Sequence, residues 1–194
     1  RDADTAGCPG DENEIAGELY PNGIHEPLRE CLEEAGCEVG IATLDEPDHG
    51  LPSEVLEETD VLLWWAHLAN EEVEDEIVER VYDHVLEGMG LLVLHSARRS
   101  KVFEKLMGTS CAAKVRDADE TERIWIVDPA HPIVDGIEKN YLEFAESQVA
   151  VEPFDIPVPD QLVMVSWLEG GEIFRSGCCF QRGKGKIFFF GPGH

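Results

Sequence analysis

The fold is decided by the stretch Gly90-Leu91-Leu92-Val93-Leu94-His95-Ser96-Ala97-Arg98-Arg99-Ser100-Lys101, in which an unbroken apolar run ends at a His-Ser pair. An apolar run without polar alternation is typical of a strand that is covered on both faces. The period then changes, because apolar residues recur at helical spacing from Val102 and Gly108 can close a helix. The stretch therefore predicts a strand, a sharp turn and a helix. His95 and Ser96 would lie at the carboxyl end of the strand, where open α/β sheets bind ligands.

The composition favours one globular domain and excludes two classes of partner. The 194 residues are 43% hydrophobic, and 41 Asp and Glu against 15 Lys and Arg give a net charge of −26. A surface this acidic repels phosphate and anionic lipid, so we expect neither nucleic acid nor a membrane as partner. The sequence shows no signal peptide, no long apolar span and no CxxC pair, which favours the cytoplasm. We expect a flexible acidic lead-in over residues 1–18 and a single domain over residues 19–194.

Strands and helices alternate along the first half of the chain. We expect helices over residues 22–36, 53–58 and 70–88, the last capped by Asn70, and strands over residues 39–44, 61–65 and 90–94. Alternation at these lengths predicts a parallel sheet with right-handed crossovers. The second half predicts strands over residues 124–127, 142–151, 162–168, 173–180 and 186–190, the last three joined by hairpin turns. We expect these strands to extend the parallel core as an antiparallel sheet.

Histidines mark the expected carboxyl edge of this sheet. His49, His67, His95 and His194 each follow a predicted strand, and His25 lies near the start of the first helix. Imidazole transfers protons near neutral pH and binds metals, so a shared site is one hypothesis. The alternative is that loops tolerate histidine and that several of these side chains are simply exposed.

Three other features of the sequence are candidates for chemistry. Ser96 occupies a strand-to-helix turn, but the glycines of a nucleophile elbow are replaced by Leu94 and Arg98. Cys111 could act as a nucleophile, although an isolated cysteine is more often a small buried hydrophobe. Arg98, Arg99 and Lys101 open a helix against its dipole. This pattern indicates an anionic or polyhydroxylated ligand, and pairing with nearby carboxylates is an equal alternative.

Several stretches between residues 20 and 194 carry a family resemblance, among them Leu63-Trp64-Trp65-Ala66-His67, Leu92-Val93-Leu94-His95-Ser96, Met107-Gly108-Thr109-Ser110-Cys111 and Gly191-Pro192-Gly193-His194. They resemble the trehalose-utilisation (ThuA-like) family of the class I glutamine amidotransferase-like superfamily. The resemblance implies an α/β fold, a flavodoxin-like three-layer α/β/α sandwich with a mostly parallel sheet and an antiparallel C-terminal extension.

The resemblance also bears on the site. The superfamily carries a cysteine nucleophile at the strand-to-helix turn, where this chain has His95, so glutamine amide hydrolysis is not implied. His194 resembles the histidine of the amidotransferase triad. Family members tend to carry a second histidine three residues after each of two motif histidines, where this chain has Asn70 and Arg98. This departure weakens the expectation of a metal, and a divalent ion such as zinc on His67, His95 and His194 is left open.

Two functions are compatible with the sequence and the resemblance. The first is an enzyme of carbohydrate catabolism that acts on trehalose-like or 3-keto disaccharides by hydrolysis or isomerisation. Its acid/base groups or metal ligands would be His67, His95 and His194, and Trp65 would stack on a sugar ring. The further substrate contacts are expected from His49, His25, Ser96, Arg98 and Lys101. The second function is a noncatalytic ligand-binding or assembly protein. A small-molecule sugar is the expected partner, and a homo-oligomer is left open.

Overall fold

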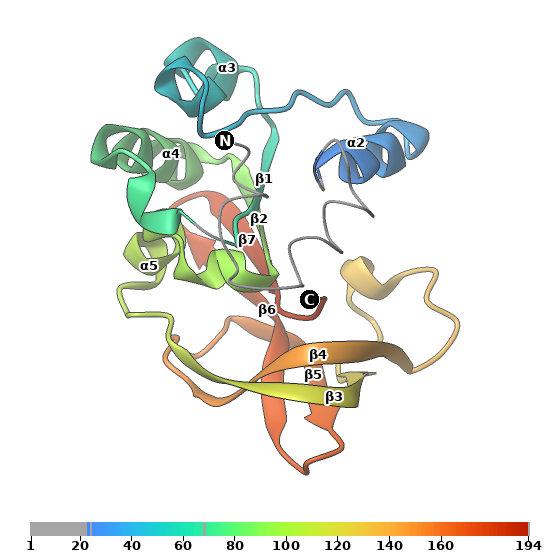
Figure 1. The fold of residues 1–194 in the computed structure, drawn as a ribbon. Helices are drawn as coiled ribbons and strands as arrows, with labels where there is room; N and C mark the ends of the chain where they lie inside the picture. The colour runs from blue at the N-terminus through green and yellow to red at the C-terminus, as the bar shows by residue number, and fades with distance from the viewer. Residues whose placement is uncertain (1–22, 24, 68, 194) are drawn as a thin grey trace.

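The computed structural model describes residues 23, 25–67 and 69–193 and is shown in Figure 1. The predicted lead-in over residues 1–18 and the candidate His194 lie outside the described residues. The elements are, in chain order, α2 His25–Glu34, η1 Pro47–Gly50, α3 Ser53–Glu57, β1 Val61–Trp65, η2 Asn70–Glu72, α4 Asp75–Glu87, β2 Gly90–Leu94, η3 His95–Arg99, α5 Lys101–Met107, β3 Ala113–Ile126, η4 Pro132–Val134, β4 Tyr141–Phe154, β5 Gln161–Leu168, β6 Ile173–Arg182 and β7 Gly185–Phe190.

The described strands form one mixed sheet in the order β1-β2-β7-β6-β5-β3-β4. Only the β1–β2 and β2–β7 pairs are parallel, and the remaining pairs, including β6–β7, are antiparallel. The sheet curls into a half-barrel, with β3 and β4 crossing below the parallel strands in Figure 1. The predicted flavodoxin-like three-layer sandwich with a mostly parallel sheet is therefore wrong. The antiparallel strands dominate the sheet and are not a minor extension of it.

Two features explain why the parallel part is smaller than predicted. The strands β3 and β4 have 14 residues each, whereas β1 and β2 have five each. In addition, residues 37–43 form no strand, and Ile41 is 37% exposed. A parallel strand needs a hydrogen-bonded neighbour. Within the described part of the chain β1 pairs only with β2, so nothing in the sheet holds the apolar residues 39–44 in a strand.

The main hydrophobic core lies between the helices α4 and α5 and the parallel strands. The apolar face predicted for α4 is buried at Ile77, Val81 and Val85. On α5, Phe103 is fully buried and its ring stacks on Phe189 of β7 with centroids 5.7 Å apart. This packing fixes the direction of η3, which connects β2 to α5 beneath the same core.

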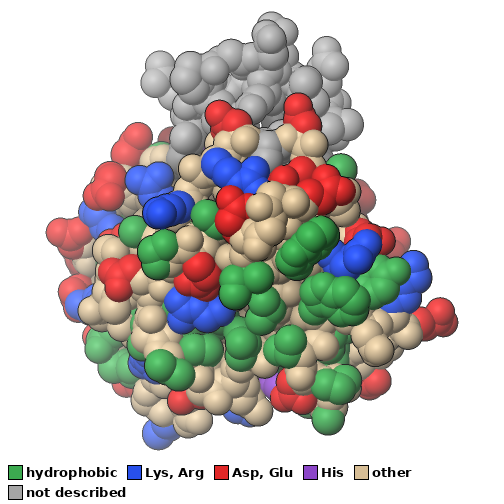
Figure 2. All heavy atoms as spheres, turned by 90° about the horizontal axis from the view of Figure 1, so that it is seen from below, with side chains coloured by type: hydrophobic (Ala, Val, Ile, Leu, Met, Phe, Trp, Pro, Cys, Tyr) green, Lys and Arg blue, Asp and Glu red, His purple; other side chains and the backbone are tan. Residues whose placement is uncertain are grey.

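A second core covers the other face of the sheet. It is formed by Ile124, Val134, Val163 and Met164, with Val134 supplied by η4. Figure 2 shows the surface on the side of β3 and β4, where hydrophobic side chains gather between groups of charged ones. Large exposed apolar residues on the antiparallel strands include Trp125 and Trp167. None of the described helices is long and apolar enough to cross a membrane.

The start of α4 differs from the prediction in a way that shapes the site. Asn70 was expected to cap this helix, but α4 begins at Asp75 after the N-cap residue Glu74. Asn70 instead opens the short 3-10 helix η2, which follows Ala69 in a left-handed conformation with φ 56°. The chain between β1 and α4 therefore folds back as a loop at the carboxyl end of β1, and Asn70 lies in that loop.

Candidate functional site

The turn after β2 places His95 in a strained backbone conformation. The strand ends at Leu94, and His95 adopts φ 49°, a left-handed value that is uncommon for a residue other than glycine. The chain then enters η3, and Ser100 caps α5 by accepting a hydrogen bond from Phe103 N at 3.3 Å. The strand, sharp turn and helix are thus formed as predicted. The left-handed residue allows the chain to reverse within one residue at the sheet edge.

Hydrogen bonds fix the orientation of His67. Its Nδ1 lies 3.0 Å from Ser96 Oγ, and Ser96 donates its hydroxyl proton to Ala66 O at 2.9 Å. Because a serine hydroxyl has one proton, Ser96 accepts from His67, and Nδ1 of His67 carries the hydrogen. In the neutral ring the lone pair is then on Nε2. Ser96, which is 7% exposed, orients an imidazole in this structure.

His95 has the same tautomer for a similar reason. Its Nδ1 lies 3.0 Å from Gly191 O, and a carbonyl oxygen only accepts, so Nδ1 donates and Nε2 holds the lone pair. Gly191 follows β7 directly and donates its own N–H to Ser176 O at 2.8 Å. A Cβ at this position would lie 2.6 Å from Cε1 of Phe174. The close packing of Gly191 therefore holds the carbonyl that orients His95.

Three aromatic rings follow one another at the carboxyl ends of β1 and β2. The His67 and His95 rings are 5° from parallel with centroids 5.8 Å apart. The Trp65 ring is stacked with the His67 ring, with centroids 6.3 Å apart and an angle of 16° between the rings. The structure thus brings together four of the predicted site residues, namely Trp65, His67, His95 and Ser96.

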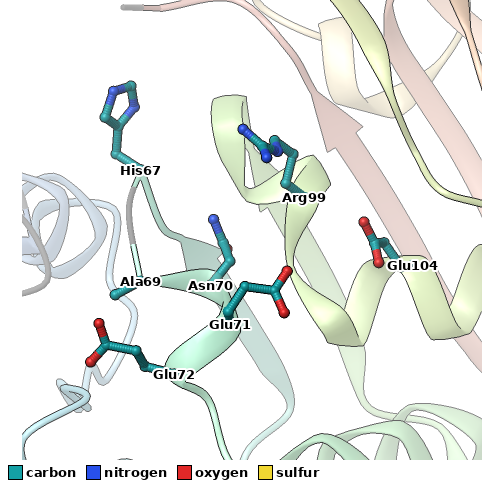
Figure 3. Close-up of a pocket in the computed structure, with 7 residues that line it drawn as sticks. All are labelled: His67, Ala69, Asn70, Glu71, Glu72, Arg99 and Glu104. Carbon is teal, nitrogen blue, oxygen red and sulfur yellow. The ribbon is translucent and has the colours of Figure 1, made fainter. Parts of the chain in front are cut away.

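A pocket of about 300 Å³ adjoins His67. Figure 3 shows its lining, with Asn70 and Arg99 directed into the space below His67 and with the carboxylates of Glu71 and Glu104 on neighbouring elements. Burial raises the pKa of Glu104, the charge of Glu71 raises it further, and Arg99 opposes both effects. Glu71 and Glu104 were not predicted, because acidic side chains are so common in this chain that two pocket carboxylates give no signal of their own.

Arg98 is the most unusual charged residue near the site. Its side chain is buried, with the residue only 7% exposed, and its Nε has no hydrogen-bond partner. Burial lowers the pKa of the guanidinium, and the adjacent charge of Arg99 lowers it further. Asn70 has a related feature, since its Oδ1 is also buried without a partner. A buried donor and a buried acceptor are thus both unsatisfied on the two loops that carry His67 and His95.

Several other predicted site residues have contacts away from the stacked rings. Both ring nitrogens of His49 make hydrogen bonds to the backbone. Nδ1 donates to Leu44 O at 2.7 Å, and Nε2 accepts from Glu74 N at 3.2 Å. Lys101 donates to Val73 O at 2.8 Å and pairs with Asp75 at 2.9 Å, which ties α5 to the start of α4. His25 is the first residue of α2 and does not line the pocket.

The buried cysteines are poorly suited to nucleophilic chemistry. Burial raises the pKa of Cys111 to about 11, despite a hydrogen bond with Thr109 that opposes the shift. Burial likewise raises the pKa of Cys178 to about 12. A thiol acts as a nucleophile only when it is ionised, so Cys111 belongs to the core, as its place among the buried residues also indicates.

The described donor set does not fit a divalent metal. Zinc sites use three or four protein ligands, and within residues 23, 25–67 and 69–193 no group of three His, Cys, Asp or Glu side chains could hold an ion. His67 and His95 are two of the three predicted ligands, and the third lies outside this range. Arg98 lies three residues after His95 in η3. Its guanidinium has no lone pair for a metal and repels a cation.

The fold and the site define an α/β protein whose imidazole pair lies at the carboxyl ends of two parallel strands, at a strand-to-helix turn. The chain belongs to the ThuA family, described as trehalose utilisation, which matches residues 18–194. The family resemblance seen in the sequence is thereby confirmed. A comparison with curated proteins finds no match.

Solved structures with low sequence identity share the fold. "Cytoplasmic Protein STM3548" from Salmonella typhimurium is 18% identical, with a TM-score of 0.58 over 84% of this chain and 73% of that chain. A putative ThuA-like protein from Parabacteroides merdae is 12% identical, with a TM-score of 0.62 over 93% of this chain and 75% of that one. The exo-beta-1,4-mannosidase Op5Man5 from Opitutaceae bacterium strain TAV5 is 18% identical, with a TM-score of 0.51 over 94% of this chain and 27% of that chain.

Proposed function

We propose that this ThuA-family protein acts on a trehalose-like or 3-keto disaccharide through proton transfer by His67 and His95. The observation that carries the proposal is the pair of nearly parallel imidazoles whose Nδ1 atoms are both committed to hydrogen bonds. Fixing the tautomer of a histidine sets which nitrogen exchanges a proton with a substrate, and here that nitrogen is Nε2 in both rings. The membership of the ThuA family, described as trehalose utilisation, supports the proposed substrate class.

The chemistry of a keto sugar suits such a pair. A neutral imidazole can remove a proton from the hydroxyl-bearing carbon beside the carbonyl while a protonated imidazole gives a proton to the carbonyl oxygen, which forms an enediol. Return of a proton to the former carbonyl carbon and loss of the proton from the neighbouring hydroxyl then complete the isomerisation. The same two groups can activate water and protonate a leaving oxygen, which hydrolyses the glycosidic bond. Trp65 continues the row of rings and offers an apolar face to a sugar. Glutamine amide hydrolysis is not part of the proposal, because His95 occupies the turn.

The test is product detection after incubation of the full chain with trehalose and with 3-keto-trehalose. We expect conversion of at least one sugar, and loss of conversion in the His95→Ala and His67→Ala variants. His49→Ala is the matched control, because His49 is bonded to the backbone on both nitrogens and should leave turnover unchanged. Absence of turnover together with intact sugar binding would contradict the enzymatic proposal.

The second candidate is a noncatalytic sugar-binding protein on the same fold. It is favoured by Asn70 and Arg98, which stand where family members tend to carry a second histidine. A neutral amide and a buried cation replace imidazoles at these two positions. Both candidates share a small-molecule sugar as partner and a cytoplasmic location, and the described cysteines are all unpaired, as a reducing compartment would leave them. Sugar binding without turnover in the experiment above is the outcome that supports this second function.

A further inference from the structure

Exposed aromatic side chains gather on the antiparallel strands, which β7 and β6 separate from the strands that carry the stacked histidines. Trp125 of β3 is 41% exposed and Trp167 of β5 is 39% exposed. Val127, directly after β3, and Ile173, at the start of β6, are each about half exposed. Figure 2 shows hydrophobic side chains gathered on the side of β3 and β4. Single exposed apolar residues are ordinary, whereas a contiguous patch of them marks a site of interaction.

The register of the sheet shows that these side chains share one face. Residues directly opposite each other on neighbouring strands point to the same side of a sheet, as do residues two apart on one strand. Trp125 lies opposite Tyr141 of β4. Arg123, two residues before Trp125, lies opposite Trp167, and Trp167 in turn lies opposite Ile173. We call these five residues the aromatic face.

Arg123 lies among the rings of the aromatic face and orients them. Its Cζ is 5.8 Å from the ring centroid of Trp125, 5.2 Å from that of Tyr141 and 6.0 Å from that of Trp167. Its Nε and Nη2 both donate to Oε1 of Glu143, at 3.0 and 2.6 Å. The side chains of Arg123 and Glu143 are 37% and 38% exposed, so a ligand on the rings can also reach this polar pair.

The size and charge of the face favour a neutral sugar over a protein. The exposed parts of Trp125, Trp167, Val127 and Ile173 amount to roughly 400 Å², whereas a stable protein interface buries about 800 Å² on each partner. A second copy of the chain would also bring another net charge of −26 to the face, and the two copies would repel each other. A pyranose is uncharged, packs its C–H face on an aromatic ring, and has hydroxyls that bond both a guanidinium and a carboxylate.

We propose that the aromatic face is a second carbohydrate-binding site, which binds a neutral oligosaccharide with Trp125 and Trp167 as its stacking residues. Trp125 and Trp167 are diagonal neighbours across β3 and β5, so one chain of sugar units can contact both rings. Arg123 is a positioning residue for the rings and, with Glu143, bonds the hydroxyls. The inference goes beyond the proposed function, because it requires no chemistry at His67 or His95.

The experiment is a proton–nitrogen-15 NMR titration of the full chain with glucose, maltopentaose and cellopentaose. The indole N–H signals of Trp64, Trp65, Trp125 and Trp167 are assigned with single Trp→Phe variants. We expect at least one pentasaccharide to shift the signals of Trp125 and Trp167 and to bind about tenfold or more tightly than glucose, because it contacts two rings. Unchanged Trp125 and Trp167 signals with all three ligands would overturn the inference.

The same titration separates this inference from the proposed function, because Trp65 belongs to the row of rings that includes the histidines. Shifts of Trp125 and Trp167 without a shift of Trp65 would support the second site alone. A shift of Trp65 without shifts of Trp125 and Trp167 would support sugar binding beside the histidines and overturn the second site.

Variants locate the binding on the aromatic face. Trp125→Ala and Trp167→Ala should each weaken pentasaccharide binding by about tenfold. Trp125→Phe retains a ring and should keep part of the affinity. Phe144→Ala is the matched control, because Phe144 is also 41% exposed but lies opposite Glu122, on the other side of the sheet. An equal loss of affinity in Phe144→Ala would overturn the assignment.

Sedimentation over the same protein concentrations tests a second copy as the occupant of the face. We expect Trp125→Ala and Trp167→Ala to leave the sedimentation coefficient of the wild type unchanged. A wild-type dimer that both substitutions dissociate, and that the pentasaccharides leave intact, would show that a second copy covers the aromatic face and would overturn the inference.

Discussion

His67 and Ser96 are joined by a hydrogen bond of 3.0 Å between Nδ1 and Oγ, across the carboxyl ends of β1 and β2. The bond has a direction, because Ser96 donates onward to Ala66 O. A residue that would be a nucleophile in a serine hydrolase therefore acts here as an acceptor that sets the tautomer of a histidine. This relationship connects the loop after β1 to the turn after β2 and makes one site of them.

Replacing Ser96 by alanine tests that role. We expect His67 in the Ser96→Ala variant to lose its fixed tautomer, because Nδ1 loses the Ser96 Oγ acceptor, and turnover to fall by about tenfold or more. Nitrogen-15 NMR of the imidazole rings measures the tautomer directly. His95 is an internal control, since its Nδ1 donates to Gly191 O and should keep its tautomer. A His67 tautomer identical to that of the wild type would contradict the assigned direction of the bond.

The left-handed turn at His95 predicts an unusual response to glycine. Both His95→Ala and His95→Gly remove the bond to Gly191 O, so their difference isolates the backbone. With φ 49° at this position, we expect the glycine variant to be the more stable by about 1 kcal/mol. Ser96, which is not among the residues with positive φ, is the matched control and should show the reverse order. Urea denaturation of the four variants gives the comparison, and the same order at both positions would contradict the prediction.

Particular residues show which parts of the fold could be predicted from the sequence. The run from Gly90 to Ser100 gave the strand, the turn and the helix, because a buried strand, a left-handed turn and a serine cap are all local properties. The curl of the sheet depends on how β3, β4 and β5 pair, which is a property of residues far apart in the chain. The missing strand at residues 39–44 depends on a neighbouring strand, and periodicity contains no information about neighbours.

The site could be predicted only as far as the strand ends determine it. Trp65, His67, His95 and Ser96 come together because they follow adjacent parallel strands, and that placement is readable from the sequence. His49 was grouped with them because it follows a predicted strand, and Lys101 because it opens a helix against its dipole. Each is held by backbone or acidic partners elsewhere. Which carbonyl or carboxylate meets a side chain is decided by tertiary packing. For the same reason Glu71 and Glu104 were not identified among the many acidic residues.

Glu104 predicts a pH dependence of stability. Burial and the charge of Glu71 raise its pKa in the folded protein. A carboxyl group with a raised pKa favours folding at low pH, and this contribution is lost as the pH rises through the folded pKa. Glu104→Gln should therefore stabilise the protein at pH 7 by up to about 1 kcal/mol, with little effect below pH 4.5, the ordinary value for glutamate. Glu57→Gln removes the same charge at an exposed site and controls for net charge. An equal gain at both pH values would contradict the prediction.

The cysteines should separate into two classes of reactivity. Cys31 and Cys37 are exposed, whereas burial raises the pKa of Cys111 to about 11 and that of Cys178 to about 12. At pH 8 the exposed thiols should react with iodoacetamide roughly a hundredfold faster than the buried ones, because only the thiolate reacts. Peptide mass spectrometry after timed labelling measures each site, and labelling in denaturant shows the full capacity. Labelling of Cys111 at the rate of Cys31 would indicate a reactive thiol at the site.

Two arginines with opposite environments predict opposite effects on stability. Arg98 is buried with an unpartnered Nε, so Arg98→Met replaces an uncompensated charge by an apolar side chain of similar length. We expect the free energy of unfolding to rise by about 1–3 kcal/mol. Arg175 pairs with Glu152. Burial alone would raise the pKa of Glu152, but hydrogen bonds from Arg175 and from backbone N–H groups outweigh burial and lower this pKa. Arg175→Met leaves that carboxylate without its partner and should lower the free energy of unfolding by about 1–3 kcal/mol. Urea denaturation of both variants in the same buffer tests the contrast. A loss of stability in Arg98→Met as large as that in Arg175→Met would mean that Arg98 is already compensated in the ligand-free protein.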